Sequence, residues 1–224
     1  MRSRVIRPDE SNLIDLPGVG PCPRPVDIDQ SVTGMSRLKS LRAYRFAPET
    51  TIAGESEVDE VLIVVLEGRI SMEVSGASSL SAEFGPGQIL YMPPDHAYRL
   101  TPLARCIVAY GRAEASSSRD ARAITGTAAA GEVLHLRRLS LRAGEAVTLD
   151  AEALALVASG TAEALVASGA AEALAASGTA EALVASGAAE AEDAPMGPLS
   201  VLAVDAGSGT IQGTGTAEVW VYSA

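Results

Sequence analysis

The stretch that decides the fold is EVLIVVLEGRISME, residues 60–73, an apolar run that stops at a glycine and resumes as an alternating strand. Further on, residues 85–96 read GPGQILYMPPDH, which is a turn, a short apolar run and a second turn that contains proline. Glycine and proline favour turns because glycine tolerates positive φ and proline fixes φ. Short apolar runs between such turns predict buried β-strands.

Composition limits the classes of protein that this chain can represent. With 224 residues, 47% of them hydrophobic, it can form one large domain or two small ones. Its formal net charge of −11 argues against nucleic acid or an anionic membrane surface as a partner. There is no secretory signal pattern and no apolar run of membrane-spanning length, so we expect a cytoplasmic protein. Cys22 and Cys106 form neither a disulfide framework nor a zinc site.

Between residues 38 and 110, strand patterns recur every 8 to 12 residues, and no helical patterns separate them. This spacing predicts an all-β sandwich or barrel. The predicted strands are 40–46, 60–66, 69–74, 79–84, 89–92, 97–100 and 105–110. Residues 1–36 are predicted to be an N-terminal arm with one short strand near 26–28, and residues 113–130 a linker.

The C-terminal part repeats this order of elements. Glu152 and Gly160 are eight positions apart, as Glu60 and Gly68 are. Residues 197–204 align with 85–92 at an offset of 112, and the same offset aligns 218–222 with 106–110. We infer an internal duplication, with a first β domain at 37–112 and a second at 131–224.

A nine-residue unit, ASGTAEALV, recurs with small changes from residues 158, 167, 176 and 185. Nine residues make 2.5 helical turns, so a helix would put successive leucines on alternate faces. The first copy overlaps an apolar run that the duplication requires, so we interpret residues 158–193 as an insertion. Three alternatives stay open: a loop without function, added strands, or a partner-binding surface.

The landmarks of the first half resemble the motifs of the cupin superfamily. Its first motif is a glycine, a His-x-His pair, a glutamate and a later glycine; the second is a Pro-Gly turn, a Pro-rich turn and a histidine. Gly54, residues 61–68, the turn at 85–87 and residues 92–94 are similar to these motifs. The resemblance implies two tandem jelly-roll barrels of the bicupin (RmlC-like) type, with a low-complexity insertion in the second.

Two isomerase groups within this superfamily are similar to parts of the chain. The first half resembles the 5-deoxyglucuronate isomerase group. Residues 139–157 and 197–221 resemble the last barrel of mannose-6-phosphate isomerases.

Cupin enzymes typically hold a divalent metal with three histidines and one glutamate. The resemblance puts Glu55 and Glu57 at the His-x-His pair, and Tyr98 at the third histidine. The glutamate position falls on Glu60 or Val61. We therefore expect no His-rich metal site and no cofactor. Glu55, Glu57 and Asp59 alternate and would share one face of a strand, either as a solvated acidic rim or as an oxygen-ligated cation site.

The ligand-binding candidates are polar side chains expected around the mouth of the first barrel, where small barrels usually bind ligands. They are Glu55, Glu57, Tyr91, His96, Tyr98 and Arg99. Arg99 has two interpretations: it pairs with a ligand carboxylate, or it neutralises the acidic cluster at residues 55–60.

Three functions are consistent with these patterns. The first is a metal-free binding protein for a small, sugar-like or carboxylated molecule. The second is a degenerate sugar isomerase. The third is a structural role in which barrels assemble into a homodimer through sheet edges, with the arm supplying a strand. The sequence does not identify the ligand.

Overall fold

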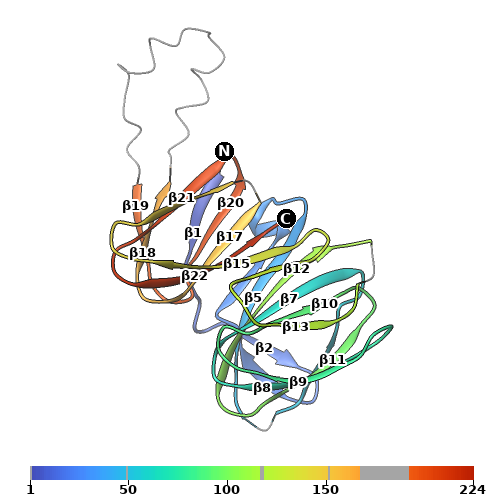
Figure 1. The fold of residues 1–224 in the computed structure, drawn as a ribbon. Coiled ribbons are helices and arrows are strands. Elements are labelled where there is room, and N and C mark those ends of the chain that lie inside the picture. Colours follow the sequence, from blue (N-terminus) through green and yellow to red (C-terminus); the bar gives the residue numbers. More distant parts are fainter. Residues whose placement is uncertain (1, 49, 117–118, 151, 167–191) are drawn as a thin grey trace, which may run out of the picture.

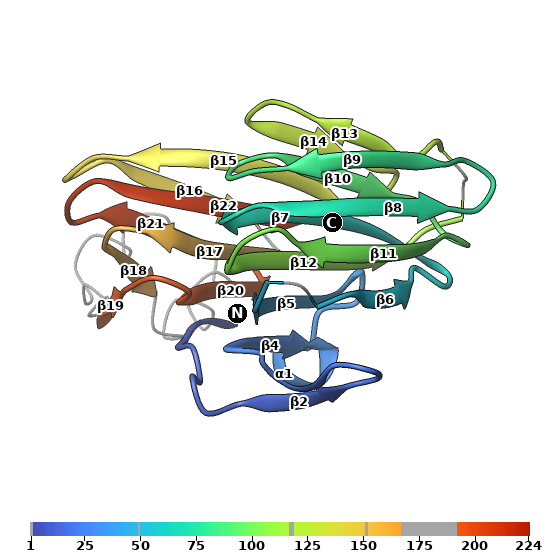
Figure 2. The same ribbon diagram turned by 90° about the horizontal axis from the view of Figure 1, so that it is seen from below.

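The computed structural model describes residues 2–48, 50–116, 119–150, 152–166 and 192–224. In these ranges the chain is almost entirely β-structure, with a single helical turn, α1 (Gln30–Thr33). The strands form two barrels that lie side by side, each built from a six-stranded and a four-stranded sheet (Figure 1 and Figure 2). The expected all-β fold of two tandem barrels is confirmed. No helix in the described ranges is long and apolar enough to cross a membrane.

The first barrel contains all seven predicted strands. Its large sheet consists of β4 (Val26–Asp29), β5 (Leu38–Phe46), β7 (Asp59–Glu67), β10 (Ile89–Met92), β12 (Cys106–Glu114) and β13 (Arg122–Ile124), in the order β13-β10-β7-β12-β5-β4. Its small sheet consists of β6 (Ile52–Glu55), β8 (Ile70–Ser75), β9 (Leu80–Phe84) and β11 (Ala97–Pro102), in the order β6-β11-β8-β9. Strand β6 has no counterpart among the predictions because its four residues, IAGE, are too few and too mixed to show an alternating pattern.

The second barrel has the same layout. Its large sheet consists of β1 (Arg2–Ile6), β14 (Ala128–Ala130), β15 (His135–Leu141), β17 (Ala153–Ser159), β20 (Val201–Ala206) and β22 (Ala217–Ser223), in the order β1-β20-β17-β22-β15-β14. Its small sheet consists of β16 (Ala146–Asp150), β18 (Ala162–Val166), β19 (Glu192–Met196) and β21 (Ser208–Gly213), in the order β16-β21-β18-β19.

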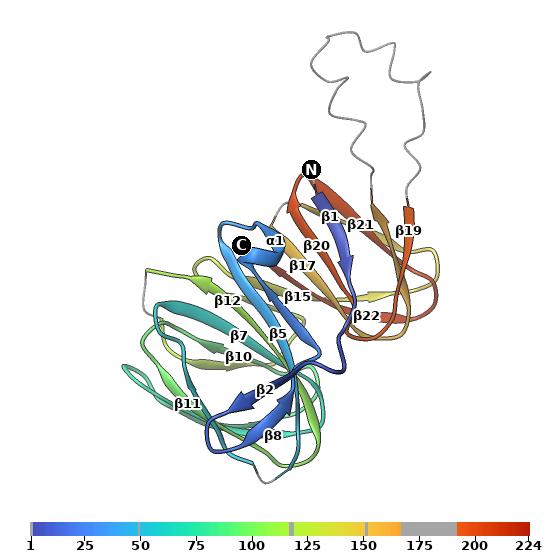
Figure 3. The same ribbon diagram turned by 180° about the vertical axis from the view of Figure 1, so that it is seen from behind.

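Segments outside the two predicted domains complete both large sheets. Strand β1 begins the chain but pairs with β20 in the second barrel, as Figure 3 shows. From the range predicted as an arm, β4 pairs with β5, close to the short strand expected there. From the range predicted as a linker, β13 pairs with β10 and β14 with β15. These strands therefore pair within the chain itself.

The uninterrupted apolar run of β7 follows from its position between two cores. Val61, Ile63 and Val65 point into the first barrel. Leu62 and Val64 point the other way, into a core shared with the second barrel that also contains Trp220. Side chains alternate along a strand, so a strand in a wall between two cores must be apolar at successive positions.

The central strands of the two large sheets pair in matching registers. In the first barrel Ile89 of β10 lies opposite Val64 of β7, and in the second Val201 of β20 lies opposite Leu156 of β17. Val64 and Leu156 hold equivalent positions, so the residue numbers of β10 and β20 differ by the predicted offset of 112. Both β7–β12 and β17–β22 also have a register shift at the corresponding place, between Ile107 and Val108 and between Val157 and Ser159. Descent of both barrels from one duplicated unit stays a prediction.

The gapless alignment of residues 218–222 with 106–110 is wrong by one residue. Ala109 of β12 lies opposite Val64, and Trp220 of β22 lies opposite the equivalent Leu156. The residue numbers of equivalent positions in β12 and β22 therefore differ by 111. An offset of 112 would match Val108, which lies inside the first barrel, with Trp220, which faces the shared core. A one-residue slip moves every side chain to the other face, and burial on both faces fixes the register.

The first copy of the nine-residue repeat belongs to the second barrel. It forms the end of β17, the turn at Gly160 and strand β18. Gly160 has a φ of 80°, and Gly68 has a φ of 79° in the corresponding turn of the first barrel. Residues 167–191, which hold most of the other copies, lie outside the described residues, so the interpretation of the insertion stays a prediction there.

A two-stranded hairpin packs on the first barrel. It consists of β2 (Leu13–Leu16) and β3 (Gly20–Pro23), and Figure 3 shows β2 beside the first barrel. Ile14, Leu16 and Val19 pack against the core of this barrel, and Cys22 is buried in it. The hairpin therefore closes part of the barrel surface near Phe46.

Candidate functional site

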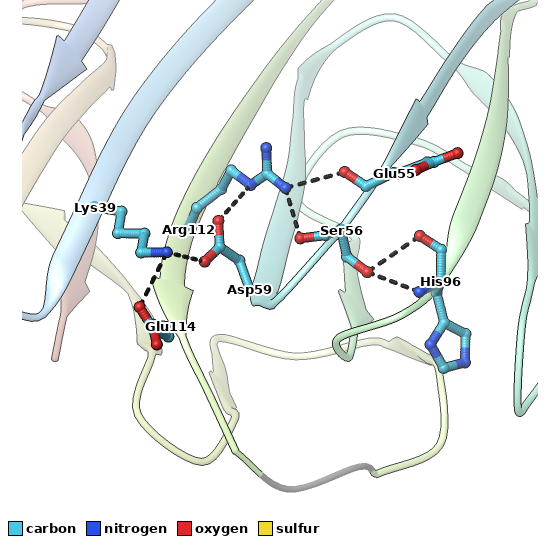
Figure 4. A network of polar contacts seen from close by, with 7 residues as sticks. All are labelled: Lys39, Glu55, Ser56, Asp59, His96, Arg112 and Glu114. Atoms are coloured by element: carbon cyan, nitrogen blue, oxygen red, sulfur yellow. Dashed lines mark hydrogen bonds and ion pairs between the residues drawn. The ribbon is translucent and has the colours of Figure 1, made fainter.

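A network of charges lies at one end of the first barrel, where β5 and β7 begin and β12 ends (Figure 4). Asp59 is buried and lies 2.6 Å from the Lys39 Nζ and 3.3 Å from the Arg112 Nε. Lys39 also lies 3.3 Å from a carboxylate oxygen of Glu114. The Asp59 hydrogen bond is the main cause that raises the pKa of Lys39. The network therefore satisfies the buried carboxylate with two cations.

Arg112 also fixes the turn between β6 and β7. Its Nη2 donates hydrogen bonds to the carbonyl oxygens of Glu55, at 3.0 Å, and Ser56, at 2.7 Å. Ser56 is buried, and its hydroxyl accepts a hydrogen bond from the His96 backbone N–H at 2.9 Å. Figure 4 shows the connection from Lys39 through Arg112 to His96.

His96 is buried, and both of its ring nitrogens have partners. Nδ1 lies 2.7 Å from the Pro94 carbonyl oxygen, and Nε2 accepts a hydrogen bond from the Ser78 backbone N–H at 3.1 Å. This assigns the ring proton to Nδ1, because a carbonyl accepts and a backbone N–H donates. The histidine therefore anchors two loops and has no nitrogen left for a ligand.

Tyr98 points into the first barrel, where it lies in a cluster with Tyr44 and Tyr110. The ring centroids are 6.4 Å apart for Tyr98 and Tyr110, and 5.4 Å apart for Tyr44 and Tyr110. Burial raises the pKa of Tyr98 to about 12, with Arg112 and the Tyr110 hydroxyl opposing the rise. The Tyr110 hydroxyl makes no well-aligned hydrogen bond in the described ranges. A methyl group on Gly54 would lie 2.5 Å from the Tyr98 hydroxyl oxygen, so only glycine leaves room for this ring.

The prediction that Glu55, Glu57 and Asp59 share one face is wrong. Strand β6 ends at Glu55 and β7 starts at Asp59, and Glu57 lies in the turn between them with a φ of 54°. Glu55 and Glu57 are exposed, whereas Asp59 is buried. The turn breaks the two-residue alternation that the prediction assumed.

Glu55, Glu57 and Arg99 border one groove, which lies outside the barrel and not at its mouth as expected, and Tyr98 belongs to its floor because its ring points into the barrel. The groove has a volume of about 610 Å³ and lies over the outer face of the small sheet, where Glu73 and Ser75 of β8 also line it. Arg99 lies between Ala53 and Glu73 in neighbouring strands, and the small side chains of Ala53 and Ala97 leave the sheet surface open. A second groove of about 450 Å³ is lined by Glu55, Glu57, Asp95 and His96 among others.

Arg99 is exposed and has no ion pair in the described part of the chain. Of the acidic cluster at residues 55–60, Asp59 is neutralised by Lys39 and Arg112 rather than by Arg99. Both interpretations of Arg99 stay predictions for the exposed Glu55 and Glu57, which line the same groove. Arg99 stays a candidate for binding a ligand. Local sequence carried no signal for Arg112, which reaches the cluster from a strand more than fifty residues later.

Tyr91 is not at the groove. It is fully buried and faces the second barrel, where its hydroxyl donates a hydrogen bond to Glu60 at 3.2 Å. The Arg122 guanidinium lies 4.4 Å from its ring centroid. Burial, followed by the charge of Glu60, raises the pKa of Tyr91 to about 12. Its place on a strand buried on both faces turns it away from any ligand of the first barrel.

Glu60 also faces the second barrel. Of the two residues assigned to the glutamate of the cupin motif, Val61 is therefore the one that points into the first barrel. The Glu60 carboxylate accepts hydrogen bonds from the backbone N–H groups of Glu132 and Val133, both at 2.7 Å, and of Leu134. Glu152, the corresponding residue of the second barrel, accepts from the backbone N–H groups of residues 36, 37 and 38. The two glutamates therefore tie each barrel to the other.

The residues of the first barrel do not fit the metal centre that the resemblance implies. The inward positions nearest the motif are Gly54, Ser56, Val61 and Tyr98, and none of them is a histidine or a carboxylate. The chain has two histidines, His96 with both nitrogens bonded and His135 in the second barrel. In the described ranges no three His, Cys, Asp or Glu side chains gather around a common point.

The comparisons agree with this architecture. Residues 24–133 match the model of the KduI/IolB family. No curated protein matches the sequence significantly.

Among solved structures, protein Ylba from E. coli matches with a TM-score of 0.74 and 11% identity, covering 99% of this chain and 90% of that one. A cupin 2 conserved barrel domain protein from Leptotrichia buccalis matches with a TM-score of 0.57 and 10% identity, covering 99% and 96%. An IolB-like protein from Salmonella typhimurium matches with a TM-score of 0.63 and 12% identity, covering 89% and 87%.

At these identities the solved structures establish the fold alone. The family match spans the first barrel, where the motif glycines and prolines lie. The likeness of the C-terminal part to mannose-6-phosphate isomerases stays a prediction. The chain thus has a two-barrel fold similar to that of a cupin-domain protein, and its first barrel is similar to the KduI/IolB family.

Proposed function

We propose that this protein binds a small, sugar-like molecule in the groove over the outer face of the small sheet of the first barrel. The observation that carries the proposal is that the charged side chains of Glu55, Glu57, Glu73 and Arg99 border a single groove of about 610 Å³. This volume lies in the range of small-molecule sites. The carboxylates of Glu55 and Glu73 can accept hydrogen bonds from sugar hydroxyls, and Arg99 can donate them.

The charges of the groove favour a neutral ligand over an anionic one. Glu55, Glu57 and Glu73 provide three carboxylates, and Arg99 is the one cation among the residues that line the groove. A carboxylated sugar would gain a bond to Arg99 but would lie within a few ångströms of three negative charges. We therefore expect a hexose to bind more tightly than the corresponding uronate.

NMR titration of the ¹⁵N-labelled protein with glucose, glucuronate and glucosamine tests this proposal. We expect saturable shifts of the amides of residues 53–55 and 97–99. Glu55→Gln and Glu73→Gln should each weaken the binding of glucose. Glu163→Gln is the matched control, because Glu163 lies between two inward alanines on the small sheet of the second barrel. Binding of glucuronate that depends on Arg99 would support a carboxylated ligand instead, and no binding would reject the site.

The match to the KduI/IolB family favours a second candidate, a degenerate sugar isomerase. The exposed carboxylates of Glu55 and Glu57 could move protons, but the inward positions of the barrel do not provide the ligands of the family's metal centre. A panel of aldoses and uronates, assayed with and without Mn²⁺ or Zn²⁺, tests this candidate. Metal-dependent turnover would support it, and its absence with every substrate would remove it.

A further inference from the structure

A further cavity, separate from the two grooves described above, lies at the opposite end of the first barrel from the Asp59 network. It has a volume of about 730 Å³ and lies between the β2–β3 hairpin and the ends of β5, β7 and β12. Two strands connect the two ends of the barrel. Strand β5 carries Lys39 of the network and ends at Phe46 in the cavity, and β7 runs from Asp59 of the network to Glu67 at the cavity. No residue of the proposed sugar groove lines this cavity.

The walls of the cavity are mainly apolar. Val19 and Pro21 of the hairpin and Phe46 of the barrel line it, and the buried thiols of Cys22 and Cys106 complete the lining. Burial is the main cause that raises the pKa of each thiol, to about 11 for Cys106. Both thiols are therefore neutral at pH 7 and act as apolar surface.

The rim of the cavity carries three charged side chains, Arg45, Arg105 and Glu67. Arg45 is already paired, because both oxygens of Glu10 accept from its guanidinium at 2.8 and 3.1 Å. Arg105 and Glu67 are exposed and have no ion pair in the described ranges. Arg105 and Glu67 therefore stand at the entrance of an apolar cavity without a hydrogen-bonded ion pair, and Arg45, whose pKa the charge of Glu67 helps to raise, is held by Glu10.

Arg105 and Glu67 belong to the same corner of the barrel. Glu67 lies opposite Ile107 in the β7–β12 pairing, two residues from Arg105. The next residue, Gly68, approaches the Arg105 backbone so closely that a methyl group on it would lie 2.2 Å from the Arg105 carbonyl oxygen. Both side chains thus start from adjacent backbone positions and border the same space.

We propose that this cavity binds a free α-amino acid with a large apolar side chain. Its carboxylate pairs with the Arg105 guanidinium, its ammonium group pairs with Glu67, and its side chain fills the space between Val19 and Phe46. A simple carboxylic acid would leave Glu67 unpaired, and a simple amine would leave Arg105 unpaired, so the zwitterion complements the rim best. This site is independent of the proposed sugar groove.

Three ligands that share one phenyl ring test the proposal: L-phenylalanine, 3-phenylpropanoate, which lacks the ammonium group, and 2-phenylethylamine, which lacks the carboxylate. Titrations followed by ¹⁵N NMR should shift the amides of Val19 and Ile107. We expect L-phenylalanine to bind most tightly, with each missing group weakening binding up to about fivefold, the range for exposed ion pairs.

Two variants assign the charges. Arg105→Gln should weaken L-phenylalanine and 3-phenylpropanoate but leave 2-phenylethylamine unchanged. Glu67→Gln should weaken L-phenylalanine and 2-phenylethylamine but leave 3-phenylpropanoate unchanged. Both side chains are exposed, so neither substitution should affect folding. Ala47→Trp, at an exposed position that lines the cavity, should block all three ligands.

Arg99→Gln, in the sugar groove, is the matched control and should leave L-phenylalanine binding unchanged. The proposal is overturned if L-phenylalanine produces no saturable shift. It is also overturned if all three ligands bind equally, or if neither charge variant changes their order. Failure of the sugar groove would appear separately, as loss of the glucose response in the wild-type protein with the response to L-phenylalanine intact.

Discussion

At the scale of single residues, Glu60 and Glu152 link the two barrels by hydrogen bonds. Each lies at the start of a central strand and accepts backbone N–H groups from the segment before the first long strand of the other barrel. Those segments end at Leu134 and Leu38, which are both buried in the shared core. A carboxylate that accepts several backbone N–H groups supplies acceptors that these buried donors would otherwise lack.

Glu60→Gln should be more destabilising than Glu152→Gln. The amide replaces one acceptor oxygen with a donor that faces backbone N–H groups, and Glu60 is fully buried while Glu152 is partly exposed. We expect a loss of about 3 kcal/mol of unfolding free energy for Glu60→Gln and about 1 kcal/mol for Glu152→Gln. Urea unfolding of both variants measures this, and equal losses would contradict the assignment.

The buried thiol of Cys106 predicts a loss of stability in alkali. Burial raises its pKa from 9.0 to about 11, so the unfolded chain releases this proton at a lower pH than the folded protein. Below pH 9 the free energy of unfolding is unaffected by this group. As pH rises from 9 to 11, ionisation of Cys106 in the unfolded chain lowers the free energy of unfolding by on the order of 2 kcal/mol. Burial of Tyr91 and Tyr98 acts in the same direction at higher pH.

Unfolding free energies measured from pH 7 to 11 for the wild type and Cys106→Ala test this prediction. The substitution lowers stability at neutral pH by removing a buried sulfur, but the curve against pH should become flatter. Parallel curves would show that Cys106 contributes nothing to the alkaline loss.

Glu152 predicts a loss of stability in acid, because its pKa is lowered where that of Cys106 is raised. Burial alone would raise its pKa, but the hydrogen bonds from Ser36, Arg37 and Leu38 outweigh burial and lower it. Its contribution to stability is therefore present above the usual carboxyl pKa of 4.5 and is lost as pH falls through the lowered value.

At the scale of elements, the turn glycines decide whether the central hairpins close. A methyl group on Gly160 would lie 1.9 Å from the Thr216 carbonyl oxygen, in addition to the strain of its positive φ. Gly68 has the same conflict with the Arg105 carbonyl. Close backbone approach and positive φ together therefore require glycine at both positions.

Gly160→Ala should destabilise the protein by about 2 to 4 kcal/mol. Gly215→Ala is the matched control, because a methyl group there meets nothing closer than 3.5 Å and its φ is not positive. Thermal unfolding should show a clearly lower midpoint for Gly160→Ala and a small change for the control. Similar midpoints would mean that the turn can move to accommodate a side chain.

At the scale of the whole molecule, the shared core makes the two barrels one cooperative unit. The large sheets contribute Leu62 and Tyr91 from one barrel and Leu156 and Trp220 from the other. Tyr222 reaches across to the first barrel, where a methyl group on Gly111 would lie 2.2 Å from its ring. Separating the barrels would expose an apolar face on each one, which opposes independent folding.

Two natural reporters test this cooperativity. Trp220, the one tryptophan, lies in the shared core, while Cys22 and Cys106 lie in the core of the first barrel. Urea unfolding followed by Trp220 fluorescence and by thiol labelling should give coincident transitions. Leu156→Ala should shift both by the same amount, about 3 kcal/mol. Thiols that stay protected after the fluorescence transition would show that the first barrel folds on its own.

The sequence by itself determined the all-β class, the seven strands of the first barrel and the arrangement in two barrels. These features depend on local patterns, because turns need glycine or proline and buried strands need apolar runs. The sequence also singled out Glu55, Glu57 and Arg99, but it placed them around the mouth of the barrel, whereas they border a groove over the outer face of the small sheet. Their role in binding stays a prediction.

Only the tertiary structure decided which way each side chain points. A turn at residues 56–58, which contains Glu57, separates Asp59 from Glu55. Tyr91 and Glu60 lie on strands of the wall between the two barrels and face the second barrel. Arg112 and Lys39 reach Asp59 from distant strands, so no local pattern could place them. The physical reason is that a strand offers two faces, and only the partner strands and neighbouring cores determine what each face meets.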